Sequence, residues 1–347
     1  MSEEIEKRKR EHIETVLRED VSGKGLTNGF ERYYFEHVAL PEIDFDKISL
    51  ETEIFGCVLQ APILISSMTG GTRLAHEINL KLAGAAQALG IAMGVGSQRA
   101  AIEDPSYEDT FRVREVAPDI LLFANLGAIQ LNYGYSSEQA KKCVEMIEAN
   151  ALFLHLNPLQ EVLQVSGDRN WSGLIKKIGD VVEAVSVPVV AKEVGNGISG
   201  VVAQSLADVG VLGVDVAGAG GTSWSEVEAY RQSNDVEKEI AHSFASWGIP
   251  TAEAIIDVNR NAPGIQVFAS GGIRNGIDAA KALNLGADLV GTAAPTLKPA
   301  IGDKLDVEEH IKMLLKVLRI TMFCVGAGDL DALRKVSMKR VNGETVV

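Results

Sequence analysis

The sequence lacks several features that define other classes of protein. None of its apolar runs reaches the roughly 18 residues needed to cross a bilayer, so we expect no membrane-spanning helix. The first ten residues, MSEEIEKRKR, have no apolar core and are not expected to act as a signal peptide. The three cysteines, at positions 57, 143 and 324, lie far apart without a metal-binding spacing. We therefore expect reduced thiols and a cytoplasmic protein.

Positive charge and aromatic residues are also scarce. There are 33 Lys and Arg against 47 Asp and Glu, a formal net charge of −14. Such a surface repels nucleic acid and anionic lipid, so we expect neither as a partner. An anionic small molecule could bind only where cations gather locally, which makes the few basic clusters informative. Only 5% of the residues are aromatic, whereas 34 are glycine, a composition that suits close packing of helices on strands.

Eight short apolar runs, each bounded by Gly, Pro or polar residues, predict buried parallel strands. Segments 74–89, 137–149, 171–185 and 276–283 have the apolar spacing of amphipathic helices. The pattern favours an α/β fold, a (β/α)8 TIM barrel over residues 51–347, with residues 1–50 as an N-terminal helical and loop extension that caps the active site. A doubly wound sheet is the alternative. The predicted strands are 62–67, 91–95, 121–125, 151–155, 187–192, 211–216, 266–270 and 287–291.

In such a barrel the chemistry occurs at the carboxyl ends of the strands, and all eight ends here are polar or glycine-rich. The most informative is segment 155–161, His-Leu-Asn-Pro-Leu-Gln-Glu, where proline should end the strand and begin a loop. Its imidazole, amides and carboxylate suit a hydrated hard cation together with an anionic ligand, and Glu161 is the best metal-ligand candidate. Taken alone, His155 could instead be a hydrogen-bonded core histidine.

Two glycine-containing segments, 270–276 and 291–294, follow the seventh and eighth predicted strands. Glycines let backbone N–H groups approach an anion, and a helix N-terminus adds positive potential. The loops after these two strands commonly hold a phosphate in this fold. We therefore predict a phosphate site here. The alternative is two tight turns that only need glycine.

Basic side chains gather at a predicted N-terminal helix, residues 3–19, and at strand ends. Arg8, Lys9 and His12 share one helix face. Followed by the glycine-rich connector 22–29, this face could close over an anion, although a basic terminus is often simply solvated. Arg99 is a further candidate anion clamp. Lys192 ends the fifth predicted strand, where an inward ammonium needs an anion or carbonyls nearby, and pairing with Glu193 is the alternative.

These residues resemble the type 2, FMN-dependent isopentenyl-diphosphate isomerases. The likeness covers nearly the whole chain in the family's order. Segments 8–13 (RKREHI) and 155–161 (HLNPLQE) are specific to the family, whereas the phosphate loops are shared with other FMN barrels. The remaining matching segments are 37–43 (HVALPEI), 68–71 (MTGG), 96–99 (GSQR), 192–195 (KEVG) and 270–274 (SGGIR).

The resemblance implies FMN, active in its reduced form, together with Mg²⁺ and with NAD(P)H as the reductant. It implies an isoprenoid diphosphate substrate and a homotetramer or larger homo-oligomer. Gln160, His155 and Lys192 would take part in catalysis, Lys192 by facing the N1/O2 edge of the flavin. The flavin would be lined by Met68, Thr69, Gly70, Ser97, Asn125, Lys192 and Thr222, and its phosphate held by Gly272, Ile273, Arg274, Ala293 and Ala294. The diphosphate would contact Arg8, Lys9, His12, Arg99, His155 and Gln160, and Mg²⁺ would be held by Asn157 and Glu161.

The implied reaction moves a double bond, converting isopentenyl diphosphate to dimethylallyl diphosphate without net redox change. An FMN-dependent oxidoreductase of the α-hydroxyacid oxidase or dehydrogenase type is the alternative. An α-hydroxyacid oxidase requires a histidine near the phosphate loops, and residues 264–295 contain none. Inosine-monophosphate enzymes need a cysteine in segment 217–224, which is absent, and the cysteines lie away from the strand ends where dihydroorotate dehydrogenases need a base. A non-catalytic sensor would not need His155, Gln160 and metal ligands together.

Overall fold

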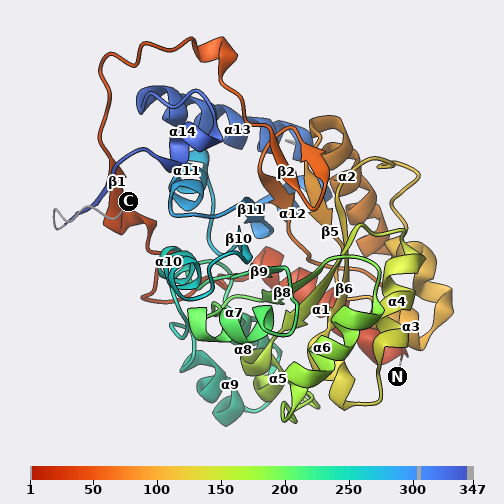
Figure 1. Cartoon of the computed structure of the whole chain (residues 1–347). Coiled ribbons are helices and arrows are strands. Elements are labelled where there is room, and N and C mark those ends of the chain that lie inside the picture. Colours follow the sequence, from red (N-terminus) through yellow and green to blue (C-terminus); the bar gives the residue numbers. More distant parts are fainter. Residues whose placement is uncertain (1, 303–305, 342–347) are drawn as a thin grey trace.

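The computed structural model describes residues 2–302 and 306–341, and of residues 2–7 only the backbone (Figure 1). Eight parallel strands form a closed barrel in chain order, with the last strand pairing to the first. The TIM barrel prediction is confirmed, and each predicted strand overlaps an observed one. The strands are β4 (Ile63–Ile65), β5 (Ala92–Gly94), β6 (Leu122–Gly127), β7 (Ala151–Leu156), β8 (Val189–Glu193), β9 (Gly213–Asp215), β10 (Gln266–Ala269) and β11 (Leu289–Thr292).

Amphipathic helices surround the barrel because each buries its apolar face on the strands. The helix predicted over 74–89 is observed as Arg73–Leu89, capped by the Thr72 hydroxyl and ended by Gly90 in the left-handed conformation. The other three predicted helices are also present, although the third begins only at Leu174. The helices are α2 (Arg73–Leu89), α3 (Arg99–Glu103), α4 (Ser137–Met146), α5 (Pro158–Leu163), α6 (Leu174–Ala184), α7 (Gly200–Ala207), α8 (Trp224–Arg231), α9 (Asp235–His242), α10 (Thr251–Asn261), α11 (Gly276–Asn284), α12 (Ala294–Ile301), α13 (Val307–Cys324) and α14 (Leu330–Arg334).

The expectation of a loop over 155–161 was wrong. Pro158 is the first residue of helix α5, which starts directly after β7. Proline suits this position because the first helical residues have no intrahelical partner for their N–H groups. Gln160 and Glu161 are therefore held on a turn of helix, and both are buried.

The amino-terminal end of the barrel is closed by a hairpin of β2 (Thr52–Ile54) and β3 (Cys57–Leu59). Its tip residue Phe55 contacts Phe123 and Phe268, and Phe123 stacks on Phe153 with ring centroids 4.3 Å apart. These rings fill the barrel interior with the small and branched residues around them. The barrel is consequently open to a ligand at the carboxyl ends of its strands and filled at the other end.

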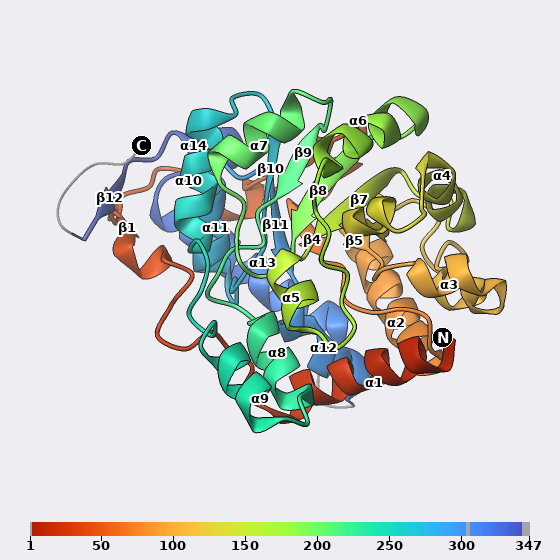
Figure 2. The ribbon, with the colours of Figure 1, turned by 90° about the horizontal axis from the view of Figure 1, so that it is seen from below.

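The N-terminal extension crosses the carboxyl ends of the barrel strands. Helix α1 (Ser2–Arg18) lies beside α8 and α3 at this end (Figure 2). The chain then pairs at Ser22 with Thr222. Further on, β1 (Tyr33–Phe35) pairs antiparallel with β12 (Met338–Arg340) near the other end of the sequence. The boundary proposed at residue 50 stays a prediction.

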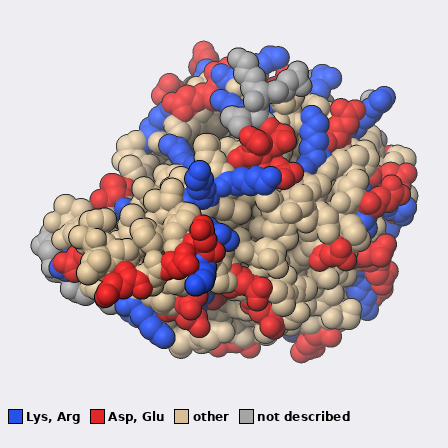
Figure 3. Space-filling view, turned by 90° about the horizontal axis from the view of Figure 1, so that it is seen from above, with Lys and Arg blue, Asp and Glu red and all other residues tan. Residues whose placement is uncertain are grey.

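The surface is charged without a large patch of one sign on the face that Figure 3 shows, where acidic and basic side chains are interspersed. None of the helices in the described ranges is long and apolar enough to cross a membrane.

The buried ring cluster predicts a specific stability effect. Phe123→Ala should lower the free energy of unfolding by about 3–5 kcal/mol, because it removes a stacked ring and leaves a cavity in the barrel floor. The control is Val58→Ala on the β2–β3 hairpin, where the side chain is 61% exposed and the change should stay within about 0.5 kcal/mol. Chemical denaturation measures both. Equal destabilisation by the two substitutions would contradict the assignment of Phe123 to the core.

Candidate active site

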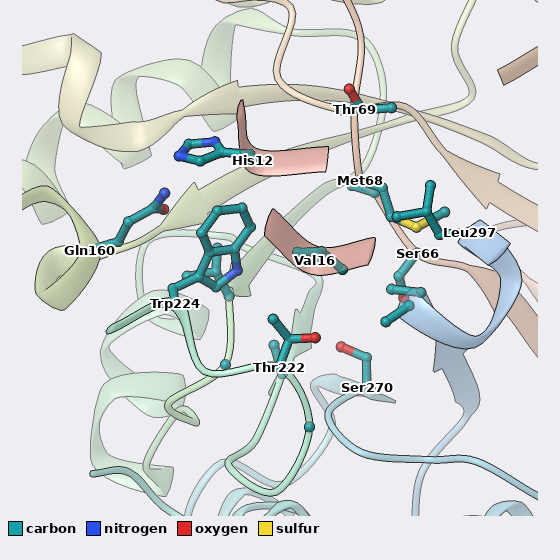
Figure 4. Close-up of a pocket in the computed structure, with 18 of the residues that line it drawn as sticks. His12, Val16, Ser66, Met68, Thr69, Gln160, Thr222, Trp224, Ser270 and Leu297 are labelled. Carbon is teal, nitrogen blue, oxygen red and sulfur yellow. The ribbon is translucent and has the colours of Figure 1, made fainter. Parts of the chain in front are cut away.

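A cavity of about 540 Å³ lies at the carboxyl ends of the barrel strands. This volume is typical of cavities that hold a cofactor or a small-molecule ligand. Helix α1, α5, the start of α12 and the loops after the strands form its walls (Figure 4). Every site residue expected from the sequence lines this one cavity: Arg8, Lys9, His12, Met68, Thr69, Gly70, Ser97, Arg99, Asn125, His155, Asn157, Gln160, Glu161, Lys192, Thr222, Gly272, Ile273, Arg274, Ala293 and Ala294.

Two cations of α1 reach the cavity. The Lys9 ammonium donates to the Ser97 carbonyl at 3.0 Å and lies 5.1 Å from the centroid of the Phe111 ring. Burial, helped by the charge of Arg8, lowers the Lys9 pKa to about 7. Burial also lowers the pKa of Arg8, which is near the charges of Arg99 and Arg231. A dianionic ligand would relieve this repulsion, which makes the α1 face suited to phosphate.

A hydrogen-bond network centred on Glu228 joins α1 to α5 and α8. The Glu228 carboxylate is fully buried and lies 3.1 Å from His12 Nε2. It also accepts hydrogen bonds from Gln160 Nε2 at 3.1 Å and from Arg231 at 2.6 Å. Burial raises the Glu228 pKa, but its His12 and Gln160 partners and the charge of Arg231 outweigh that effect and lower it. Glu228 thus fixes the orientation of the Gln160 amide toward the cavity (Figure 4).

His155 is held at the end of β7 by Asn125. Its Nδ1 lies 2.8 Å from Asn125 Oδ1, and since that oxygen only accepts, Nδ1 carries the proton and Nε2 is left as an acceptor. Burial, together with the charges of Lys192, Lys9 and Arg99, lowers the His155 pKa to about 4. His155 is therefore neutral at pH 7.

The first turn of α5 presents oxygen atoms that fit a hard cation. Asn157 Nδ2 donates to Gln160 Oε1 at 3.1 Å and to Glu161 Oε1 at 3.0 Å. Asn157 Oδ1 is buried and has no hydrogen-bond partner, a state that usually signals a missing ligand or water. In the described part of the chain no three His, Cys, Asp or Glu side chains gather as a metal site. A cation here would need phosphate or water as its remaining ligands.

Arg99, expected as an anion clamp, is held by acidic side chains at the edge of the cavity. It pairs with Glu103 at 2.7 Å and with Asp168 at 3.1 Å. Asp168 also accepts from Gln130 Nε2 at 2.9 Å, while its own backbone N–H donates to Glu161 at 2.8 Å. A phosphate ligand would have to compete with these carboxylates for the guanidinium.

Lys192 does not pair with the Glu193 carboxylate. Its ammonium forms an ion pair with Asp215 at 2.9 Å and donates to the Glu193 carbonyl oxygen at 3.0 Å. The Glu193 carboxylate instead accepts three backbone N–H groups, of residues 194–196. Burial outweighs these bonds and raises the Glu193 pKa to about 7.

The predicted phosphate loops lie on the other side of the cavity. Gly272 has a φ of +73°, and a Cβ there would be 2.5 Å from the Gly220 carbonyl oxygen, so only glycine fits without displacement. The Asn28 amide of the connector donates to the Gly272 carbonyl at 2.8 Å. Nearby buried hydroxyl oxygens have no hydrogen-bond partner and are free to bind a ligand: Ser66, Ser67, Thr69 and Thr292.

Sequence reasoning missed four polar residues of this site, namely Glu228, Arg231, Asp215 and Asp168, and the aromatic Trp224. The Trp224 ring packs edge-on against His12 with centroids 5.1 Å apart. Asp215 left a signal, because it is the only charged residue in the predicted strand 211–216. Glu228 left no signal in the sequence, because α8 also carries Glu226 and Arg231 and nothing in the sequence distinguishes one of these charged residues from the others.

Comparison with known proteins agrees with this geometry. The sequence matches the family described as FMN-dependent dehydrogenase over residues 1–112 and 136–340. An isopentenyl-diphosphate delta-isomerase of Synechocystis sp. is 59% identical over 331 residues, which cover 95% of each chain. The isopentenyl-diphosphate delta-isomerase of Cronobacter sakazakii is 50% identical over 342 residues, covering 98% of this chain and 99% of that protein.

Solved structures share the fold at low sequence identity. A flavocytochrome b2 variant with sulfite bound has a TM-score of 0.68 and 20% identity, covering 94% of this chain and 82% of that one. A mandelate oxidase variant has a TM-score of 0.66 and 18% identity, covering 95% of both chains. The structural matches show the fold, whereas the sequence matches also identify the family. This chain therefore belongs to the FMN-dependent dehydrogenase family and, within it, to the type 2 isopentenyl-diphosphate delta-isomerases.

Proposed function

We propose that this cavity interconverts isopentenyl diphosphate and dimethylallyl diphosphate with reduced FMN and Mg²⁺ bound beside the substrate. Membership of the isomerase family makes the chain an isopentenyl-diphosphate delta-isomerase of isoprenoid biosynthesis. The proposal for this site rests on one observation. Cationic residues of α1 and the glycine-containing loops after β10 and β11 line a single cavity, which gives room for two phosphorylated ligands.

FMN fits the barrel side of the cavity. Its phosphate would be held by the loop after β10 and the start of α12, through Gly272, Ile273, Arg274, Ala293 and Ala294. The ring would meet Met68, Thr69, Gly70, Ser97, Asn125, Lys192 and Thr222. The unpartnered hydroxyl of Thr69 supports this assignment, because it is buried and needs an acceptor or donor. Since the reaction consumes no electrons, we propose NAD(P)H as the separate source of the reduced form.

The diphosphate and Mg²⁺ fit the side nearest α1. Arg8, Lys9, His12 and Arg99 would contact the diphosphate, and Lys9 would become a full cation again once an anion lies beside it. Asn157 and Glu161 would hold Mg²⁺, which commonly takes one or two protein ligands and completes its shell with phosphate and water. The unpartnered Asn157 Oδ1 supports this assignment.

Double-bond transposition requires a proton at the terminal alkene carbon and loss of another from C2. When bound in its reduced form, FMN supplies an acid–base group near its N5 position. An alkene is a poor base, so water must be excluded, and α1 does this by covering the cavity with apolar side chains such as Val16 and Leu17. Gln160, oriented by Glu228, would lie near the reacting carbons. Neutral His155 would accept a hydrogen bond through Nε2 rather than compete for the proton.

The oxidoreductase alternative has support from the fold and from the broad FMN-dependent dehydrogenase family, whereas the relatives of high sequence identity are isomerases. Flavocytochrome b2 and mandelate oxidase share the barrel at about one fifth identity, and the segment 264–295 of this chain has no histidine to abstract a proton. A homotetramer or larger homo-oligomer stays a prediction from the family resemblance.

The first test of the proposed function uses the purified protein under anaerobic conditions in D₂O. It is mixed with FMN, Mg²⁺, a flavin reductant and isopentenyl diphosphate, and the product is followed by NMR. We expect deuterated dimethylallyl diphosphate only when the flavin is reduced, and little product when Mg²⁺ is chelated. Absence of product with FMN bound and fully reduced would overturn the proposed use of the cofactor.

Replacing Gln160 tests its place in the proton transfer. Gln160→Ala should lower kcat by about 10²- to 10⁴-fold, the usual contribution of an acid–base group. Gln204→Ala is the matched control, since this glutamine is on α7 and donates to Asp208 at 2.6 Å, away from the cavity. Steady-state kinetics measures both. A Gln160→Ala enzyme that keeps more than half of the wild-type kcat would exclude the residue from the mechanism.

The lowered pKa of His155 predicts a pH dependence of stability. Below about pH 6.5 the unfolded chain takes up a proton at this imidazole, whereas the folded protein does so only near its pKa of about 4. Protonation therefore favours unfolding, and this contribution lowers the free energy of unfolding as pH falls from 6.5 to 4. We expect His155→Gln to reduce that fall, with the exposed His37→Gln as matched control.

Denaturant titrations of the three proteins at pH 7.5 and pH 4.5 measure this effect. If His155→Gln and the wild type lose the same stability between the two pH values, then His155 is not held neutral by its surroundings.

A further inference from the structure

The ion pair between Lys192 and Asp215 is built into the barrel wall. The two residues are direct partners in the register of β8 and β9, so their side chains leave the sheet at the same level. Lys192 Nζ lies 2.9 Å from Asp215 Oδ2, and the Asp215 side chain is fully buried. The pairing thus follows from strand register and would persist whatever occupies the cavity.

Asp215 is held from a second side as well. Its Oδ1 accepts from Ser270 Oγ at 2.6 Å and from the Ala217 backbone N–H at 3.2 Å. Ser270, in turn, lies 3.4 Å from Lys192 Nζ. Lys192 and Ser270 line the cavity, whereas Asp215 does not. Ala217 also lines the cavity, so Asp215 can affect a ligand only through these three neighbours or through its charge.

The Lys192 ammonium donates two hydrogen bonds, to the Glu193 carbonyl oxygen and to Ser270 Oγ, whereas its contact with Asp215 Oδ2 is an ion pair without hydrogen-bond geometry. The contacts with Asp215 and with the Glu193 carbonyl oxygen are short, and the one with Ser270 is long. The long contact is the one that a ligand acceptor would replace. The same lysine thus carries a compensated charge and points one donor at the cavity.

We propose that Asp215 is a positioning residue for Lys192, which fixes the ammonium and offsets its charge, so that the pair and not the lysine alone sets the redox equilibrium of bound FMN. This inference rests on the proposed binding of FMN in the cavity. A reduced flavin carries its negative charge at the N1/O2 edge, and the protein tunes it through charge placed there. A bare ammonium would stabilise the reduced anion far more than a nearly neutral pair does.

The test compares the midpoint potential of bound FMN in four variants with the wild type, from pH 6 to pH 9. The variants are Asp215→Asn, Lys192→Met, the double variant that carries both, and Asp288→Asn as control. Asp288 is a matched acid, because it accepts the Val267 N–H at 2.9 Å and pairs with Arg334 at 3.0 Å at the other end of the barrel. Absorbance spectra and thermal unfolding establish flavin content and folding of each protein.

We expect Asp215→Asn to favour the reduced flavin at least tenfold at pH 6, about 30 mV for a two-electron couple. Lys192→Met should favour the oxidised flavin, because it leaves the carboxylate uncompensated, and the double variant should return close to the wild type. Asp288→Asn should leave the potential unchanged. A purely structural role of Asp215 would change the stability of the variants, but it would not make their midpoint potentials follow the net charge of the Lys192–Asp215 pair.

An Asp215→Asn protein that binds FMN with the wild-type potential at pH 6 would overturn this inference alone. If that single variant does not fold, Lys192→Met and the double variant still decide, since equal potentials for these two would mean that the Asp215 charge has no effect on the flavin. Wild-type protein that binds no FMN would overturn the proposed function and this inference together.

Discussion

Closure of a parallel barrel is the constraint on which the site depends. Because all eight strands run in the same direction around a closed ring, their carboxyl ends meet at one rim. The Phe123, Phe153 and Phe268 rings fill the interior beneath, and the hairpin with Phe55 seals the other end. Residues as far apart in sequence as Thr69 and Ala294 must then share one cavity. The chain needs only to place polar side chains at strand ends, and the fold brings them together.

A basic helix laid across that rim costs the protein stability. Lys9 rests on a carbonyl oxygen and a ring face, and burial takes its pKa down to about 7. A group whose folded pKa is lowered in this way prefers the unfolded, hydrated state wherever it must carry its charge. Such a cost is common where residues are selected for binding instead of for packing. In a chain with a net charge of −14, this is also the place where an anion meets local attraction.

The barrel and most of the site could be predicted from the sequence because their signals are local. An apolar run bounded by glycine or proline predicts a strand, and the polar residue that follows the run predicts the end of that strand. Lys192 and His155 were predicted at strand ends in this way, and both are found there. Glu228 could not be predicted, since its partner His12 is 216 residues away and only tertiary packing joins them. Asp215 was predictable in principle, from a lone acid in an apolar strand next to one ending in lysine. The segment from Pro158 was predicted as a loop but is helix α5, because a proline can either end a strand and begin a loop or be the first residue of a helix.

The two ends of the cavity differ in how their cations are balanced, and that difference suits two different ligands. Lys192, at the end of β8, is paired with a carboxylate that the strand register places beside it, so that part of the cavity carries little net charge. On the α1 side, burial and the charge of Arg8 lower the pKa of Lys9, and burial and the charge of Arg99 lower the pKa of Arg8 although Glu161 and Glu228 act in the opposite direction. A buried cation without a local counter-ion is expensive unless a ligand supplies one. The α1 side of the cavity is therefore suited to an anion, whereas the ion pair of Lys192 with Asp215 leaves little net charge on the barrel side.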